Sequence, residues 1–208
     1  MKKFEFTGET KQVELLFRTA TLHRIKAVAE FGIVKVGDLG GWIEKEENLS
    51  HEGKAWVWGD AEVYGDAKVW GNAKVWGDAK VYGDAKVYGD AKVWGNAKVC
   101  GDAEVWGNAK VCGDAEVWGN AKVCGDAEVF SISHVLVIGP IGSRNDFTTF
   151  FRDKDSEITV KCGCFLGKID KFLKKVCETH GDSQYAIVYR TAVEIAKQQI
   201  DLSEEKQL

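Results

Sequence analysis

Residues 67–72 read Ala67-Lys68-Val69-Trp70-Gly71-Asn72, one copy of a six-residue unit that repeats without a break from Val57 to Val129. Alanine and valine alternate with a charged residue and a large, usually aromatic one, which is the period of two expected of a β-strand. Glycine followed by aspartate or asparagine then predicts a tight corner, because these residues tolerate positive φ angles. We therefore expect each unit to form one short strand and one bend, with alanine and valine on the inner side.

Units of this length most economically close into triangular coils of three units, or about 18 residues. Residue n then lies over residue n+18 at the parallel strand spacing of ~4.8 Å, and the valines meet in the interior. Burial of each valine contributes on the order of 1.5 kcal/mol. The sequence therefore predicts a mainly β fold, a left-handed parallel β-helix. A right-handed β-helix is the alternative, although its coils usually vary more in length.

The repeat divides the chain into three regions. Residues 1–50 are non-repetitive and predict an N-terminal β cap, residues 51–134 form the β-helix, and residues 135–208 lose the period and predict a C-terminal α+β module. A β-helix leaves an open strand edge and an open core at each end. Both flanking regions are therefore candidates for covers over these ends.

Short patterns predict elements within the two flanking regions. The first region has strand-like alternation and a glycine-rich turn, and the last has three apolar runs followed by two helical patterns. The expected elements are strands at 3–6 and 25–31, a turn at 37–41, strands at 134–138, 147–151 and 158–161, a helix ending at Gly181 and a helix capped by Asp182 or Ser183.

The composition narrows the classes of partner. The chain of 208 residues has a formal net charge of −4, so we expect no binding to duplex nucleic acid or to an anionic membrane surface. No apolar run approaches the ~20 residues that span a bilayer. The stretch from Met1 to Phe6 is not followed by the apolar core of a signal peptide. A cytoplasmic protein is expected, and its six cysteines are then most simply reduced thiols.

Stacking by 18 residues sorts the outward side chains into three faces, each with a column of aromatic residues beside a column of charges. The face that is most basic and richest in tryptophan contains Trp58, Trp76, Trp94, Lys74, Lys92 and Lys110. In one interpretation, the stacked rings and lysine stems only strengthen the coils. In a second, a face is buried by another subunit, and a homotrimer of parallel prisms is the expected assembly. In a third, these residues bind a flat anionic ligand by stacking and charge.

Residues 139–145, Gly-Pro-Ile-Gly-Ser-Arg-Asn, follow an apolar run and offer a second candidate site. Backbone N–H groups and Arg144 can hold a phosphate there. The segment matches no nucleotide-binding fingerprint, however, and a plain hairpin turn is favoured. Arg144, Asn145 and Lys161 are the residues that we expect to contact a small anion in this module.

Cys162, Cys164, Cys177 and His180 supply enough thiol and imidazole groups for a tetrahedral zinc site. The Cys-x-Cys spacing is tighter than usual for zinc, and Cys162 and Cys164 are expected to point the same way from a strand. Buried thiols are therefore the favoured interpretation. Neither a metal nor an organic cofactor is predicted.

Three segments before the repeats carry a resemblance. They are residues 22–27 (Leu-His-Arg-Ile-Lys-Ala), residues 37–44 (Gly-Asp-Leu-Gly-Gly-Trp-Ile-Glu) and residues 48–50 (Asn-Leu-Ser). Together with the repeats, they resemble hexapeptide-repeat proteins of Firmicutes and of their phages and prophages, many of which are labelled only as hypothetical or as transferase hexapeptide proteins. The resemblance implies the β-helix fold but no established activity.

The hexapeptide fold hosts acyltransferases that use a coenzyme A thioester and a histidine base, so this activity is one alternative. Here no excursion interrupts the repeat, and only His51 and His134 lie at coil ends. Because a fold does not imply a function, the main hypothesis is a non-catalytic, homotrimeric binding protein. By the resemblance, it is phage- or prophage-encoded and captures a small nucleotide-like anion or a host protein. A structural spacer or virion component is the other alternative.

Overall fold

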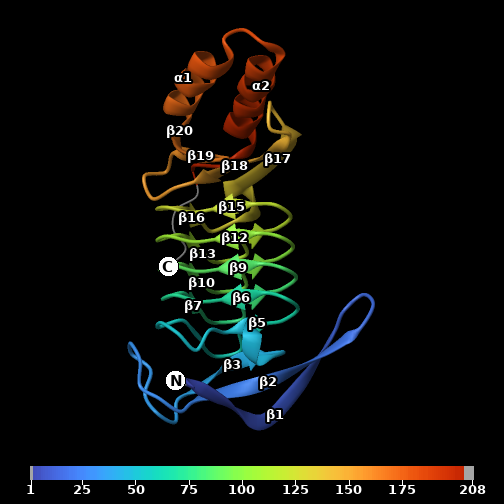
Figure 1. The fold of residues 1–208 in the computed structure, drawn as a ribbon, viewed down its shortest axis with the longest axis vertical. Coiled ribbons are helices and arrows are strands. Elements are labelled where there is room, and N and C mark those ends of the chain that lie inside the picture. The colour runs from blue at the N-terminus through green and yellow to red at the C-terminus, as the bar shows by residue number, and fades with distance from the viewer. Residues whose placement is uncertain (1, 204–208) are drawn as a thin grey trace.

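The computed structural model describes residues 2–203, which form an elongated rod (Figure 1). A curved β-hairpin lies at one end, stacked coils form the middle, and a small α+β module lies at the other end. The predicted fold class is confirmed, because the chain is mainly β and its parallel coils repeat every 18 residues. No helix within residues 2–203 is long and apolar enough to cross a membrane.

Each repeat unit contributes one strand of two residues. The strands are β4 (Trp56–Val57), β5 (Glu62–Val63), β6 (Lys68–Val69), β7 (Lys74–Val75), β8 (Lys80–Val81), β9 (Lys86–Val87), β10 (Lys92–Val93), β11 (Lys98–Val99), β12 (Glu104–Val105), β13 (Lys110–Val111), β14 (Glu116–Val117), β15 (Lys122–Val123) and β16 (Glu128–Val129). Each strand pairs in parallel with the strand one coil away, as Lys74 with Lys92. The coils therefore have three walls, built from β4-β7-β10-β13-β16, β5-β8-β11-β14 and β6-β9-β12-β15.

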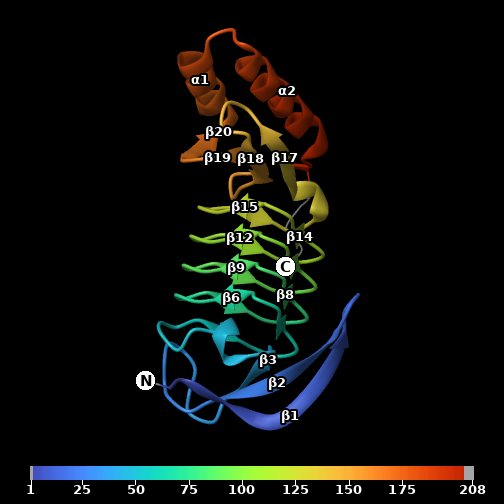
Figure 2. The ribbon, with the colours of Figure 1, turned by 45° about the vertical axis from the view of Figure 1, so that its right-hand side comes forward.

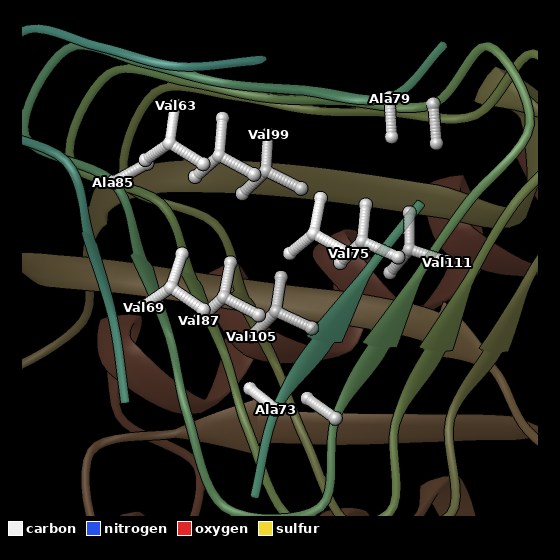
Figure 3. Packing of buried hydrophobic residues seen from close by; sticks show 14 of the residues in the cluster. Val63, Val69, Ala73, Val75, Ala79, Ala85, Val87, Val99, Val105 and Val111 are labelled. Atoms are coloured by element: carbon white, nitrogen blue, oxygen red, sulfur yellow. The ribbon is translucent and has the colours of Figure 1, made fainter. Parts of the chain in front are cut away.

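The interior of the coils is a column of valine and alanine side chains. Val63, Val69 and Val75 lie on three different walls and point toward a common interior, where Val87 and Val105 continue the stack of Val69 (Figure 3). The predicted inner positions are thus confirmed, with relative exposures of 0 to 1%. Packing of this kind excludes water and polar groups, so the interior supplies stability and the outer faces must supply any ligand site.

Each corner requires glycine, as Gly89 illustrates. Its φ angle is +70°, in the left-handed region that other residues adopt only at a cost. A Cβ at this position would also lie 2.9 Å from the backbone nitrogen of Gly107 in the next coil. The corners can therefore stack at strand spacing only because they carry no side chain.

The N-terminal residues form an antiparallel sheet that continues one wall of the coils. It contains β1 (Phe4–Glu14), β2 (Thr19–Ala27) and β3 (Leu39–Ile43), and β3 pairs in parallel with β5. A short 3-10 helix, η1 (Glu46–Asn48), then leads into the first coil. The predicted N-terminal β cap is confirmed by this arrangement.

Several predicted bounds in this cap are wrong. The strand expected at 3–6 continues to Glu14, and the strand expected to begin at Ile25 begins at Thr19. The strand expected at 25–31 ends at Ala27, and the turn expected at 37–41 is shorter, because Gly40 and Gly41 belong to β3. A Cβ on Gly40 would lie 2.5 Å from a side-chain carbon of Ile25. The two glycines therefore allow a close approach between strands rather than forming a bend.

Large apolar side chains close the N-terminal end of the coil interior. Phe4, Ile25 and Trp56 are fully buried there. The ring of Phe31 packs edge-on against Trp56, with a centroid distance of 5.3 Å. These residues replace the missing coil beneath Val57 and keep water out of the core.

The β1–β2 hairpin extends beyond the coils and curves upward beside them (Figure 2). Near its tip, Val13 and Leu15 pack against the cluster that contains Tyr64, and Tyr82 joins the same cluster. Burial raises the pKa of Tyr64 to about 12. The hairpin therefore covers the wall that contains β5 and β8, although Phe17 at its tip is 94% exposed.

The C-terminal residues form a four-stranded antiparallel sheet with two helices packed against it (Figure 1). The elements are η2 (Ile132–His134), β17 (Val135–Ile141), β18 (Asp146–Arg152), β19 (Ile158–Cys162), β20 (Phe165–Lys168), α1 (Ile169–His180) and α2 (Gln184–Gln199). Three strands and both helices match the predictions, and α1 ends before Gly181 as expected. Strand β20 was not predicted.

This sheet closes the C-terminal end of the coils. Phe151 is fully buried and packs into the coil interior, whereas its neighbour Phe150 packs with the helices. The backbone N–H of Lys154 donates to the carbonyl oxygen of Asp126 at 3.0 Å, which joins the module to the last coil. The module thus acts as the expected cover of the far end.

Candidate functional site

The predicted tryptophan and lysine columns lie on the wall built from β4, β7, β10, β13 and β16. Lys74, Lys92 and Lys110 are in direct parallel register, one per coil. They line a hollow of about 600 Å³ that also contains Trp58 and Lys54. We call this hollow the lysine groove.

A loop of the N-terminal cap forms one end of the lysine groove. Gly32, Ile33 and Val34 reach the groove from the segment between β2 and β3. The side chain of Ile33 is 72% exposed in spite of its apolar character. Sequence reasoning did not find this loop, because the contact joins segments far apart in the chain and no local pattern indicates it.

The tryptophan column forms one side of the groove. The rings of Trp76 and Trp94 are parallel, with a centroid distance of 4.9 Å and an interplanar angle of 0°. Trp58 instead packs edge-on against Trp56 at 6.5 Å. A smaller hollow of about 440 Å³ adjoins the groove here, lined by Ile33, Trp58, Trp76, Lys74 and Lys92. Trp94 supports the stacked ring from the next coil and does not line either hollow.

The opposite side of the groove is a column of amides and carboxylates. The side-chain amide of Asn72 donates to the carboxylate of Asp90 at 3.1 Å, and Asn108 donates to Asp126 at 3.1 Å in the same way. Alternation of donor and acceptor removes the repulsion that stacked carboxylates would have. Asp90 nevertheless repels an anion, so the tryptophan side is the favourable side for a negatively charged ligand.

The lysines of the groove differ in their ion pairs. Lys110 pairs with Glu128 at 2.8 Å. Lys74 and Lys92 form no ion pair with any residue in the described range 2–203. Their strands are neighbours at a spacing of about 5 Å, and two like charges on adjacent strands disfavour each other. An anion between them would remove this repulsion.

The other two walls differ in the balance of charge around their lysines. A hollow of about 600 Å³ on the wall of β6, β9, β12 and β15 is lined by three lysines against four carboxylates, whereas the lysine groove has four lysines against one carboxylate. On the wall of β5 and β8, Lys80 pairs with Glu62 at 3.0 Å and the hairpin covers the rings. The lysine groove is therefore the most cationic of the three.

The three candidates in the C-terminal module lie around two neighbouring hairpin turns. Residues 142–145 form the β17–β18 hairpin turn, in which the Asn145 N–H donates to the Gly142 carbonyl at 3.3 Å. The favoured hairpin interpretation is thus confirmed. Arg144 and Lys161 both reach Gly163 in the β19–β20 turn. A Cβ at Gly163 would lie 3.0 Å from a guanidinium nitrogen of Arg144, and the Lys161 ammonium is bonded to the Gly163 carbonyl and lies 6.0 Å from the ring centroid of Trp106. Arg144 lines a separate pocket between the sheet and the helices.

The cysteine predictions need correction. Cys162 ends β19 and is half-buried, whereas Gly163 has a φ angle of +54° and turns the chain. Cys164 therefore does not continue the strand, and it is exposed, as is Cys177 on α1. Within residues 2–203, no group of three or more His, Cys, Asp or Glu side chains is placed to hold a metal ion.

Both histidines at the coil ends have local structural partners. His51 accepts a hydrogen bond from the Lys3 backbone N–H at 3.1 Å, and its ring stacks on Phe4 at 4.4 Å. His134 is fully buried and accepts a hydrogen bond from the Phe130 N–H at 3.1 Å. These contacts hold the first and last coils against their covers.

The sequence matches no protein-family model and no curated protein. The lysine groove and the smaller hollow beside it bring together five of the nine predicted residues, Trp58, Trp76, Lys74, Lys92 and Lys110.

Proposed function

We propose that this protein is a non-catalytic binding protein that holds a small anionic ligand with a planar ring, such as a nucleotide, in the lysine groove. The observation that carries the proposal is the position of Lys74 and Lys92, which have no ion pair within residues 2–203, beside the half-buried ring of Trp76 in a hollow that no carboxylate of the described chain lines. The ammonium groups supply charge-assisted bonds to a phosphate or carboxylate. The indole supplies a surface on which a flat ring can stack.

The geometry favours a ligand over a purely structural role for these side chains. Ring stacking strengthens the coils on other walls too, as Trp70 and Tyr88 show with a centroid distance of 4.4 Å. Some lysines of the walls have carboxylate partners, as Lys98 has in Glu116 at 2.8 Å. Lys68 and Lys86 have no ion pair within residues 2–203 either, but four carboxylates line their hollow, whereas one lines the lysine groove. The lysine groove is therefore the better suited of the two to bind an anion.

We propose further that the protein assembles as a homotrimer with parallel axes. The triangular cross-section supports this assembly, as do large apolar side chains that one chain leaves in water, such as Phe17 at 94% and Trp118 at 61% exposure. Three chains of 23.0 kDa would give about 69 kDa by light scattering. If light scattering at micromolar concentration gives the mass of one chain, the trimer is contradicted, but the proposed binding in the lysine groove is not.

Titration calorimetry with a panel of mononucleotides and of linear and cyclic dinucleotides tests the binding function. We expect Lys92→Gln to raise the dissociation constant by roughly 10-fold or more, since a hydrogen bond to a charged group contributes about 1.5–3 kcal/mol. Lys86→Gln is the matched control, because Lys86 is an exposed lysine at the equivalent position of another wall. Quenching of tryptophan fluorescence should accompany binding, since the groove contains indoles.

Two results would count against the proposal. One is the absence of binding across the panel at millimolar concentration. The other is an equal loss of affinity in Lys86→Gln and Lys92→Gln, which would indicate non-specific attraction by surface charge. If the protein is phage- or prophage-encoded, as the resemblance implies, a host nucleotide signal is the first ligand to include in the panel.

A further inference from the structure

The C-terminal module contains a second concave site that the proposed function does not use. It lies between the β17–β18 turn, the β19–β20 turn and helices α1 and α2, and it has a volume of about 420 Å³. This volume is in the range of small-molecule pockets. We call it the module pocket.

Aromatic rings form the floor of the module pocket. Phe172 packs edge-on against Tyr189 with a centroid distance of 5.6 Å, and it lies 5.3 Å from Phe165. Phe172 and Tyr189 are buried. These rings are fixed by their mutual contacts, so the floor is a preformed apolar surface.

Two glycines hold the hairpin turns over this floor. A Cβ at Gly142 would lie 1.9 Å from the Tyr189 hydroxyl, so the first turn contacts this tyrosine through its backbone. A Cβ at Gly163 would lie 3.0 Å from a guanidinium nitrogen of Arg144. The absence of a side chain at Gly163 therefore leaves room for the Arg144 guanidinium against the second turn, and both residues line the pocket.

The rim of the pocket is basic. Arg144 forms no ion pair with any residue that the structure describes, and Lys175 has only a long contact of 3.7 Å with Glu178. Asp146 contributes one carboxylate to the lining, and His180 stacks on Tyr189 at 5.8 Å. With a neutral histidine, the rim therefore carries a net charge close to +1.

We propose that the module pocket binds an aromatic monoanion, a planar ring system that carries a single carboxylate. The ring would contact Phe165, Phe172 and Tyr189, and the carboxylate would accept hydrogen bonds from Arg144, whose planar guanidinium matches its geometry. A single net charge on the rim favours one negative charge on the ligand over the several charges of a polyphosphate. This proposal is independent of the lysine groove.

Binding of 2-naphthoate, with neutral 2-naphthamide as its isostere, tests the proposal by protein-observed NMR and calorimetry. We expect naphthoate to bind with a dissociation constant below about 1 mM and naphthamide to bind at least ~10-fold more weakly, because a charged hydrogen bond is lost. Arg144→Gln should weaken naphthoate binding by about 10-fold for the same reason. Circular dichroism confirms that each variant is folded.

Two neighbouring lysines of α1 give a matched comparison. Lys175 lines the pocket and Lys174 does not, although both are exposed on the same helix. Lys175→Gln should weaken naphthoate binding, whereas Lys174→Gln and the groove variant Lys92→Gln should not change it. No binding at millimolar naphthoate, equal affinity for the amide, or equal effects of the two α1 variants would each overturn the proposal.

Discussion

Replacement of Lys3 by methionine removes a buried ammonium group from the N-terminal cap. Lys3 is 3% exposed, and its ammonium donates to the Ala55 carbonyl oxygen at 2.8 Å. The ammonium also lies 4.7 Å from the ring centroid of Phe31. The side chain therefore closes the first coil with a charge in place of an apolar group, which is costly without a carboxylate partner.

The cost follows from the pKa of Lys3. Burial lowers this pKa from its usual 10.5 to about 8. The difference of 2.5 (10.5 minus 8) corresponds to about 3 kcal/mol. Between pH 8 and 10.5 the unfolded chain holds this proton and the folded chain does not, so the free energy of unfolding rises with pH in this window. Below pH 8 both states are protonated, and the contribution is constant.

Urea unfolding followed by far-UV circular dichroism at pH 7 to 10 measures this effect. Relative to Lys3→Met, the wild-type protein should gain up to about 3 kcal/mol as the pH rises through the window. The comparison with Lys3→Met is necessary because buried thiols make the free energy of unfolding fall, not rise, with increasing pH. The pKa of Cys124 is raised to about 11 by burial, so its contribution to stability is lost as the pH rises above 9.

The difference in the free energy of unfolding between wild type and Lys3→Met at neutral pH is less informative than the change of this difference with pH. Methionine removes the buried charge but leaves the Ala55 carbonyl without this donor, which costs about 1–3 kcal/mol and offsets the gain. Lys2→Met serves as the control, because the Lys2 side chain is 59% exposed. Parallel pH profiles for wild type and Lys3→Met would refute the reasoning, as would a change of slope in Lys2→Met.

Two further predictions concern the coils and the thiols. Gly89→Ala should lower the free energy of unfolding by about 2–3 kcal/mol, because Gly89 has a left-handed φ and an added Cβ would clash with Gly107. Gly119 has a φ of +63°, but an added Cβ would have no atom within 4 Å, so Gly119→Ala should lower it by only about 1 kcal/mol. Equal midpoints of urea denaturation for the two variants would contradict the stacking argument. At pH 8.5, iodoacetamide should modify the exposed Cys164 within minutes and spare the buried Cys124 until the protein is unfolded, as mass spectrometry of digested peptides would report.

The sequence predicted the coils because every constraint on them is local and repeated. A unit such as 67–72 contains its own strand, corner and inner residues, and the 18-residue period then determines which side chains share a wall. The column of Lys74, Lys92 and Lys110 could therefore be identified without coordinates. The predicted contact between this column and a ligand stays a prediction.

The covers were predicted only in outline, because their contacts join residues that are distant in sequence. Lys3 bonds to Ala55 across 52 positions, and no pattern near either residue indicates this. Strand β20 is short and contains Gly167, so its extended form depends on pairing with β19 and has no strong local signal. The expected common direction of Cys162 and Cys164 failed because Gly163 adopts a left-handed conformation that strand alternation does not include.

The site itself depends on where the repeat loses its symmetry. Identical units would give three equivalent walls, and none would be a unique site. Two departures select one wall: its hollow is lined by one carboxylate of the described chain, against four on the wall of β6 and β9, and the cap loop places Ile33 against it. The pairing of β3 with β5 fixes the rotation of the cap around the coil axis, and it therefore determines which wall the loop reaches. Since adjacent walls are one unit apart, a shift of six residues in that pairing would move the loop to a wall whose lysines already face carboxylates. The register of the cap on the first coil thus contributes as much to the groove as the lysines do.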